Sequence, residues 1–308
     1  MHSALDFVTL RQIMPRMKHI LHCLALSLTF LLASCNQYSM VTKSTDYDYK
    51  YEVAKQCYAA GQYNRAANIL QDVIAMYKGT DKGEESLFLL GLSSFKARNY
   101  DAASAYLKRY YQSYPKGTYA ERARFYSGLA LYESTPEVRL DQSGTYAAVT
   151  EFSNYLELYP AGEYSKEAQR LIFEMQDKLV EKEYLSAKLY YDLGSYFGNC
   201  TNGGSNYQAC IVTAQNAIKD YPYTSHREAF AILILRAKFT LATQSVEEKK
   251  VERYQDAIDE YYGFMTEYPE SQYMKEAKQL FAKASKYVKT TDGTDDDGPS
   301  SSSDAKTE

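Results

Sequence analysis

The feature that most constrains the fold is a Tyr-Pro pair that recurs along the chain. The pair occupies positions 114/115, 159/160, 221/222 and 268/269, and each follows an apolar stretch with helical spacing. Proline has no N–H to donate and disfavours the helical conformation of the preceding residue, so each pair predicts the end of a helix. A small residue stands twelve positions before each proline, at Ala103, Ala148, Cys210 and Ala257.

The same pattern extends toward the start of the chain, without the proline. Twelve residues before Lys78 lies Ala66, which marks a first unit. In the first three units a partner helix is visible around Ala54, Gly91 and Gly128, which are 37 residues apart. Small residues at these points allow two helices to approach closely. A helix pair that repeats every 34 to 45 residues or so is typical of an α-solenoid, in which each unit buries its apolar face against its neighbours.

We therefore predict an all-α solenoid of five helix pairs followed by a C-terminal helix. The solenoid is expected over 47–290, after a removed signal segment (1–34) and an anchor and spacer (35–46), and before a disordered acidic and serine-rich tail (291–308). Between Glu163 and Leu193 there is no Gly or Pro, so one long helix and a helix broken near Val180 are both compatible. The expected helices are 47–60, 64–77, 82–97, 101–113, 118–133, 146–158, 163–197, 207–220, 225–242, 250–267 and 271–287.

The N-terminal segment reads as a secretory signal. Basic residues precede an apolar run from Cys23 to Ala33, which is too short to cross a bilayer of about 30 Å. The sequence Leu32-Ala33-Ser34-Cys35 resembles the bacterial lipobox. That resemblance implies cleavage before Cys35 and attachment of a diacylglyceryl group and a further acyl chain such as palmitate, and Asn36 favours the outer membrane. The alternative is an ordinary signal with an incidental Cys35. Translation could also start at Met14 or Met17.

The composition argues against catalysis and against nucleic-acid binding. The formal net charge is −4, with no basic cluster of the kind that binds nucleic acid. After Cys35 the only histidine is His226, expected in the first turn of a helix, so a histidine-based metal site or catalytic triad has little to draw on. No P-loop, dinucleotide fingerprint or zinc spacing is present. We therefore expect a non-enzymatic protein without a metal or cofactor.

Cys200 and Cys210 flank a Gly-Gly loop and present two alternatives. Outside the cytoplasm they could form a disulfide. Cys210 also stands where other units carry a buried alanine, so it could equally be a packed free thiol.

Sequence motifs indicate a known repeat class and a known family. The run Glu84 to Gly91, followed by Asn99 to Ala103 and Tyr114-Pro115, resembles the tetratricopeptide pattern. The order of lipobox, spacer, five such units, an insertion at 134–144 and a long helix carrying Met175 to Tyr184 resembles the BamD family of outer-membrane assembly lipoproteins. The resemblance covers about residues 35 to 269. The C-terminal helix with its acidic tail and the Gly-Gly loop depart from the family.

The resemblance implies a role in the β-barrel assembly machinery. Family members lie on the periplasmic face of the outer membrane, bind the periplasmic domains of the barrel-forming subunit and engage unfolded outer-membrane proteins. One alternative is a tetratricopeptide adaptor lipoprotein for cell-wall enzymes. A glycan-binding surface lipoprotein is a weaker alternative, because such proteins generally use tryptophan platforms and this chain has no tryptophan.

Six aromatic residues are the candidate peptide-binding groove. In a solenoid of this class the first helix of each pair lines the concave side. Three residues before the small residues of those helices are Tyr51, Phe88 and Phe125, here called the first column; four residues after them are Tyr58, Phe95 and Tyr132, the second column. Large rigid rings suit the apolar side chains of an extended peptide. The alternative is packing between helices, especially for the second column. Three cations near the same surface could bind a C-terminal carboxylate or could simply be solvated: Lys55, Lys96 and Arg122.

Overall fold

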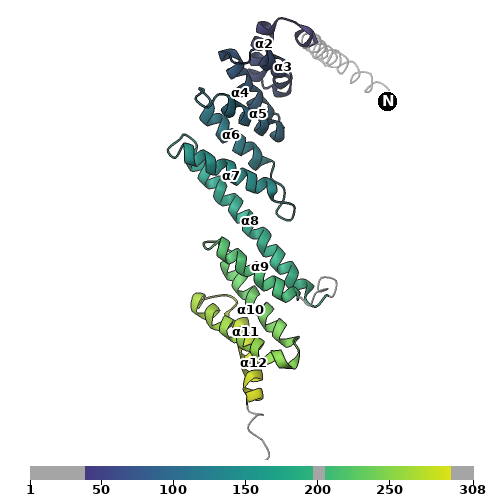
Figure 1. The fold of residues 1–308 in the computed structure, drawn as a ribbon, viewed down its shortest axis with the longest axis vertical. Helices are drawn as coiled ribbons and strands as arrows, with labels where there is room; N and C mark the ends of the chain where they lie inside the picture. The colour runs from purple at the N-terminus through teal and green to yellow at the C-terminus, as the bar shows by residue number, and fades with distance from the viewer. Residues whose placement is uncertain (1–38, 197–204, 293–308) are drawn as a thin grey trace, which may run out of the picture. The chain divides into compact units, whose positions relative to one another are not determined.

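The computed structural model describes residues 39–196 and 205–292, and every regular element in these ranges is a helix (Figure 1). The predicted all-α fold is therefore confirmed. Residues 39–43 are helical, and the longer helices are α2 (Tyr47–Ala59), α3 (Tyr63–Met76), α4 (Asp81–Lys96), α5 (Tyr100–Ser113), α6 (Ala120–Glu133), α7 (Ser143–Leu158), α8 (Ser165–Leu193), α9 (Asn206–Asp220), α10 (Arg227–Thr243), α11 (Glu247–Glu267) and α12 (Met274–Asp292).

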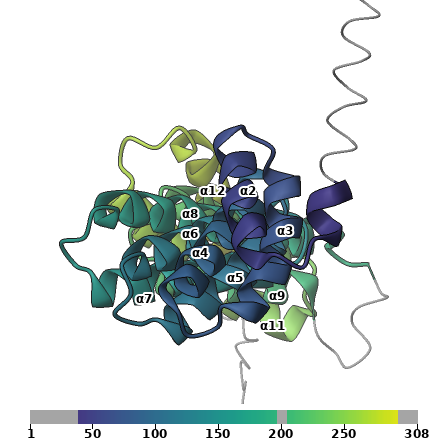
Figure 2. The same cartoon turned by 90° about the horizontal axis from the view of Figure 1, so that it is seen from above.

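The chain divides into two compact units within α8. The first unit comprises Met1–Thr135 and Tyr146–Gln169, and its described part contains the pairs α2/α3, α4/α5 and α6/α7. Each helix from α2 to α6 packs against the next along the chain, and α2 to α5 lie beside one another in both views (Figures 1 and 2). This sequential packing is what the tetratricopeptide pattern predicts.

The second unit comprises Pro136–Thr145 and Arg170–Glu308, with α9 to α12 and most of α8. In it α10 packs on α9 and α11, and α12 packs on α11 and α10. The predicted long helix is continuous as α8, with Val180 buried in its interior, so a break there does not occur. The last helix runs from Met274 to Asp292, five residues beyond the predicted end.

Small residues mark the close helix contacts, as predicted. The alanines 54, 66, 103 and 148, together with Cys210, have no exposed surface, and Ala257 is 2% exposed. A Cβ atom on Gly91 would lie 2.6 Å from Cγ of Leu107 on the neighbouring helix. A larger residue at position 91 would therefore force the Leu107 side chain, or the backbone that carries it, to shift.

Enlarging one of these small residues should destabilise the repeat. Ala103→Leu is expected to lower the free energy of unfolding by roughly 1 to 3 kcal/mol, because overpacking a close helix contact forces backbone shifts. Neighbouring units depend on one another for burial, so the loss should extend beyond α5. Chemical denaturation measures the midpoint. Ala105→Leu, at an exposed position of the same helix, is the matched control. An unchanged midpoint for Ala103→Leu would contradict the packing described for α5.

The Tyr-Pro pairs end their helices as predicted. In each case the tyrosine N–H donates the last hydrogen bond, for example from Tyr114 to the carbonyl of Tyr110 at 2.8 Å and from Tyr159 to that of Tyr155 at 2.8 Å. The following proline cannot continue the ladder. A turn then leads the chain into the first helix of the next pair. After Tyr114-Pro115 this turn contains Gly117 and Tyr119, which contribute to the candidate site.

Candidate functional site

The first column is buried in seams between helices. Tyr51, Phe88 and Phe125 are 4%, 3% and 4% exposed. Phe88 stacks on Tyr119 at a centroid distance of 4.4 Å with nearly parallel rings, and Phe125 stacks on Tyr164 at 4.4 Å. Each stacking tyrosine stands five residues after the tyrosine of a Tyr-Pro pair. As they stand here, these three rings serve packing and offer little surface to a ligand.

The same contact recurs with different residues in the other repeats. After the first helix pair, α2/α3, Lys82 occupies the position that Tyr119 has after the second pair. The Lys82 ammonium lies 5.7 Å from the centre of the Tyr51 ring. In the second unit His226 lies 5.9 Å, centre to centre, from Tyr184. Tyr184 stands three residues before the buried Ala187, which fixes Ala187 as the small residue of the fourth first helix. His226 lies at the start of α10, as predicted.

A carboxylate and a tyrosine hold the turn after each of two Tyr-Pro pairs. The Tyr110 hydroxyl donates to Glu84, and Glu84 also accepts from the N–H of Thr118 at 3.0 Å, while the N–H of Tyr119 donates to the Tyr110 hydroxyl at 3.1 Å. Burial, and then the bond to Glu84, raise the pKa of Tyr110 well above its usual value. Gly117 lies between these hydrogen-bonded groups, where an added Cβ would be 2.5 Å from the Glu84 carboxylate.

The third pair of helices repeats this arrangement. The Tyr155 hydroxyl donates to Glu121 at 2.8 Å, and Glu121 accepts from the N–H of Glu163 at 2.8 Å. Burial, and then this bond, raise the pKa of Tyr155 to about 12. These hydrogen bonds hold the turn that carries the tyrosine stacked on Phe88 or Phe125. The position of each of these two rings is therefore set by the turn as well as by its own helix.

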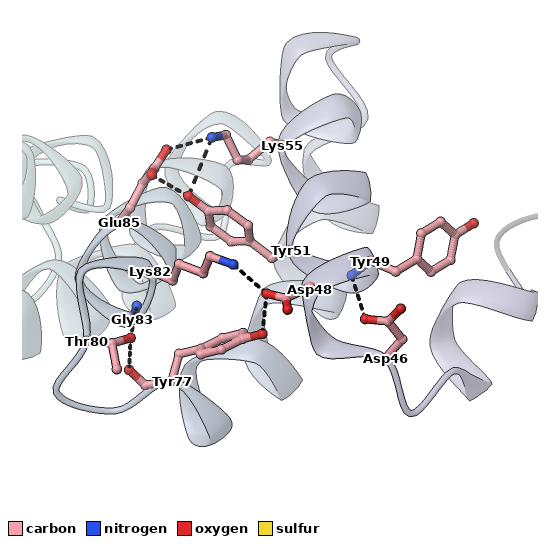
Figure 3. Close-up of polar contacts among 10 residues, drawn as sticks. All are labelled: Asp46, Asp48, Tyr49, Tyr51, Lys55, Tyr77, Thr80, Lys82, Gly83 and Glu85. Carbon is pink, nitrogen blue, oxygen red and sulfur yellow. Dashed lines mark hydrogen bonds and ion pairs between the residues drawn. The ribbon is translucent and has the colours of Figure 1, made fainter.

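Tyr51 belongs to a polar network on α2 and α4 (Figure 3). Its hydroxyl donates to Glu85, which also pairs with the Lys55 ammonium at 3.3 Å. Burial raises the pKa of Tyr51, and the bond to Glu85 adds to the rise. Beside it, Lys82 and Tyr77 both donate to Asp48, at 2.5 and 2.6 Å, and the Lys82 bond holds the pKa of that carboxyl below its usual value. Because Lys55 pairs with Glu85, its charge is already balanced within the protein, which weakens its case as a binder of a ligand carboxylate.

The second column is more exposed than the first. From the sequence we expect the second column to be the one more involved in packing between helices, and the structure shows the reverse. Tyr58, Phe95 and Tyr132 are half-buried. Tyr58 meets Tyr63 edge to face at 5.6 Å, and Phe95 meets Tyr100 in the same way at 5.6 Å, so each is braced by the tyrosine that begins the following helix. All three rings of the second column keep part of their surface exposed.

Two further side chains complete this aromatic surface. Tyr126 on α6 is half-buried and meets Phe95 edge to face at 5.5 Å. Arg122, one turn earlier on α6, places its guanidinium 5.6 Å from the centre of the Phe88 ring. We call Tyr58, Phe95, Tyr126, Tyr132 and Arg122 the aromatic face. Lys96 is exposed at the end of α4.

Some of these residues were missed by the sequence reasoning. Tyr119 and Tyr164 carry a signal, since the spacing Tyr-Pro-x-Gly-x-Tyr occurs twice, at 114–119 and 159–164. Glu84 and Glu121 are 37 residues apart, the period of the repeat, and they could have been found from it. Tyr126 has no such marker, because its role depends on the distance between α4 and α6.

The comparisons with known proteins agree with this architecture. Residues 44–202 match YfiO, the family described as outer membrane lipoprotein, which is more than half of the chain. The chain belongs to this family. It is also similar to the outer membrane protein assembly factor BamD of Caulobacter vibrioides, with 22% identity over 181 residues. That similarity covers 59% of this chain and 56% of the relative, so the chain spans just over half of the relative's length.

The chain therefore belongs to a family of outer membrane lipoproteins, and this family is non-enzymatic. None of the described helices has a stretch that is both long and apolar enough to cross a membrane. Within the described residues no group of histidine, cysteine or carboxylate side chains is placed to hold a metal ion. Cys35 and Cys200 lie outside the described residues, so lipidation and the Cys200–Cys210 disulfide stay predictions. Cys210 is buried, and burial raises the pKa of its thiol to about 12.

Proposed function

We propose that the protein is a component of the β-barrel assembly machinery. It is anchored through lipid on Cys35 at the periplasmic face of the outer membrane, scaffolds the barrel-forming subunit through that subunit's periplasmic domains, and binds unfolded outer-membrane proteins. The YfiO match over 44–202 and the similarity to an assembly factor support this role.

The observation that carries the binding role is the aromatic face. Its rings come from α2, α4 and α6. Tyr58 and Phe95 each meet a neighbouring ring edge to face, and all four rings are partly exposed. Half-buried aromatic side chains give large contact area at low entropic cost. Arg122 adds a guanidinium suited to a carboxylate. We assign ligand contact to Tyr58, Phe95 and Tyr132. We assign Tyr51, Phe88 and Phe125, about two turns earlier on the same helices, to the packing that holds these helices in position.

The aromatic face should bind the C-terminal peptide of a barrel protein. Phe95→Ala with Arg122→Gln is expected to weaken binding by about 1 to 3 kcal/mol, the range seen when interface anchors are truncated. Calorimetric titration of the purified protein with the peptide measures the affinity. Tyr223→Ala is the matched control, because that ring is fully exposed and lies in the turn between α9 and α10. Unchanged affinity in a folded double variant would exclude this surface as the binding site.

The partner is tested separately. Affinity purification of the protein from native outer membranes, followed by mass spectrometry, should recover the barrel-forming subunit as the dominant companion. Recovery of cell-wall enzymes in its place would overturn the assembly role and support the adaptor alternative.

A further inference from the structure

The exposed side of α12 carries a row of lysines that is independent of the aromatic face. Five lysines are exposed on this helix: Lys275, Lys278, Lys283, Lys286 and Lys289. Four of them recur at helical spacing on one stripe, with Lys283 at its edge. A shallow depression beside Lys286 and Lys289 is also lined by Ala282, Ser285 and Thr290. We call the five lysines the lysine face.

No acidic residue of the described chain neutralises this face. The ammonium groups of the five lysines make no ion pair with any side chain described in 39–196 or 205–291. Glu276, on the same helix, faces α10 and pairs with Arg236 at 2.6 Å. The opposite side of α12 is apolar, with Ala277 and Ala284 buried in separate clusters. The cationic charge is therefore concentrated on one side.

The residues that directly follow α12 have the opposite charge. Segment 293–308 lies outside the described residues and contains Asp295, Asp296, Asp297, Asp304 and Glu308 against a single lysine, Lys306. Lys275 and Lys289 are separated by about 21 Å along the helix, at 1.5 Å per residue. An extended chain covers about 3.3 Å per residue, so Asp295 to Asp297 can reach the last lysines and Asp304 can reach the first.

We propose that the acidic segment 293–308 docks on the lysine face of α12. Five carboxylates meet five lysines, and the short tether keeps the local concentration of the segment high. Each exposed pair is individually weak and is screened by salt, so the docked segment is a displaceable cover. The inference does not rest on the proposed assembly role, and it concerns a helix beyond the residues that match the family.

Zero-length cross-linking tests the proposal on the full-length protein purified in detergent. A water-soluble carbodiimide joins a carboxylate to an amine only when the two are in contact, and mass spectrometry identifies the pair. We expect cross-links from Asp295, Asp296 and Asp297 to Lys286 and Lys289. Their yield should fall on the order of fivefold in about 0.5 M salt, because screening then acts within a few ångströms. The exposed Lys116 and Lys219 are internal controls.

Two variants and a mixture of light and isotopically heavy protein complete the design. Lys286→Arg with Lys289→Arg keeps the charge but removes the amines, and should abolish only these cross-links. Asp295→Asn, Asp296→Asn and Asp297→Asn together should increase acetylation of the lysine face and leave Lys219 unchanged. In an equimolar mixture of light and isotopically heavy protein, mixed light–heavy cross-links in the proportion expected for random pairing of copies would overturn the proposal in favour of a second copy. Cross-links spread evenly over control lysines would also overturn it, as would lysine protection that appears only with anionic vesicles.

Discussion

Tyr51→Ala combined with Phe88→Ala is expected to lose most of the stability of the first two helix pairs. Truncating a buried aromatic ring costs about 3 to 5 kcal/mol, and both rings are almost fully buried. Phe88 also loses its stack on Tyr119, and Tyr51 loses its bond to Glu85. Because each repeat stabilises its neighbour, the loss should broaden the unfolding transition of the unit. Thermal and urea unfolding measure it.

Peptide titration on the same samples separates packing from ligand contact. If the first column contacted the ligand directly, the double variant would remain stable and lose peptide affinity. Tyr51→Phe is the matched control, because it keeps the ring and removes only the hydroxyl; we expect a loss of about 1 kcal/mol, the usual contribution of one hydrogen bond. A double variant with the unfolding midpoint of the unsubstituted protein would refute the packing assignment.

Sequence periodicity predicted most of the fold because the repeat leaves chemical marks at fixed intervals. Proline is disfavoured in the interior of a helix, and a close helix contact tolerates only a small residue, so Tyr114-Pro115 and Ala103 predict the same helix independently. The end of α12 lacked such a mark. Lys289 to Asp292 contain neither proline nor glycine, and the helix continues through them beyond the predicted Tyr287.

The candidate site was less predictable, because an aromatic ring at a fixed position in a repeat can face either a ligand or the next helix. Whether such a ring is buried depends on the turn that follows the Tyr-Pro pair. Gly117 and Tyr110 hold Glu84 against the backbone, and this places Tyr119 over Phe88 and buries it. Phe95 meets Tyr100 and Tyr126 edge to face, without the parallel stack that covers Phe88, and it stays half-buried. The periodicity located both columns, but the hydrogen bonds that bury one of them join residues 26 to 34 positions apart.

Loss of the lipid anchor should release the protein from the membrane without unfolding it. Each buried CH₂ contributes about 0.8 kcal/mol, so two or three acyl chains anchor stably, whereas the chain without them has no described helix that could span a bilayer. Cys35→Ala is therefore expected to move the protein into the soluble fraction with its helical circular dichroism unchanged. The anchor lies outside the described helices, which bury their own core.

The leader must be controlled in this experiment, because an uncleaved apolar segment would itself retain the chain. Residues 1–34 are replaced by an ordinary secretory signal with its own cleavage site, and the mass of the mature chain is measured. Cys57→Ala is the matched control: this half-buried thiol lies within α2, and its loss should leave membrane attachment intact. If the processed Cys35→Ala chain still floats with membranes in high salt and carbonate, attachment rests on protein contacts, and the aromatic face and the lysine face become the surfaces to test next.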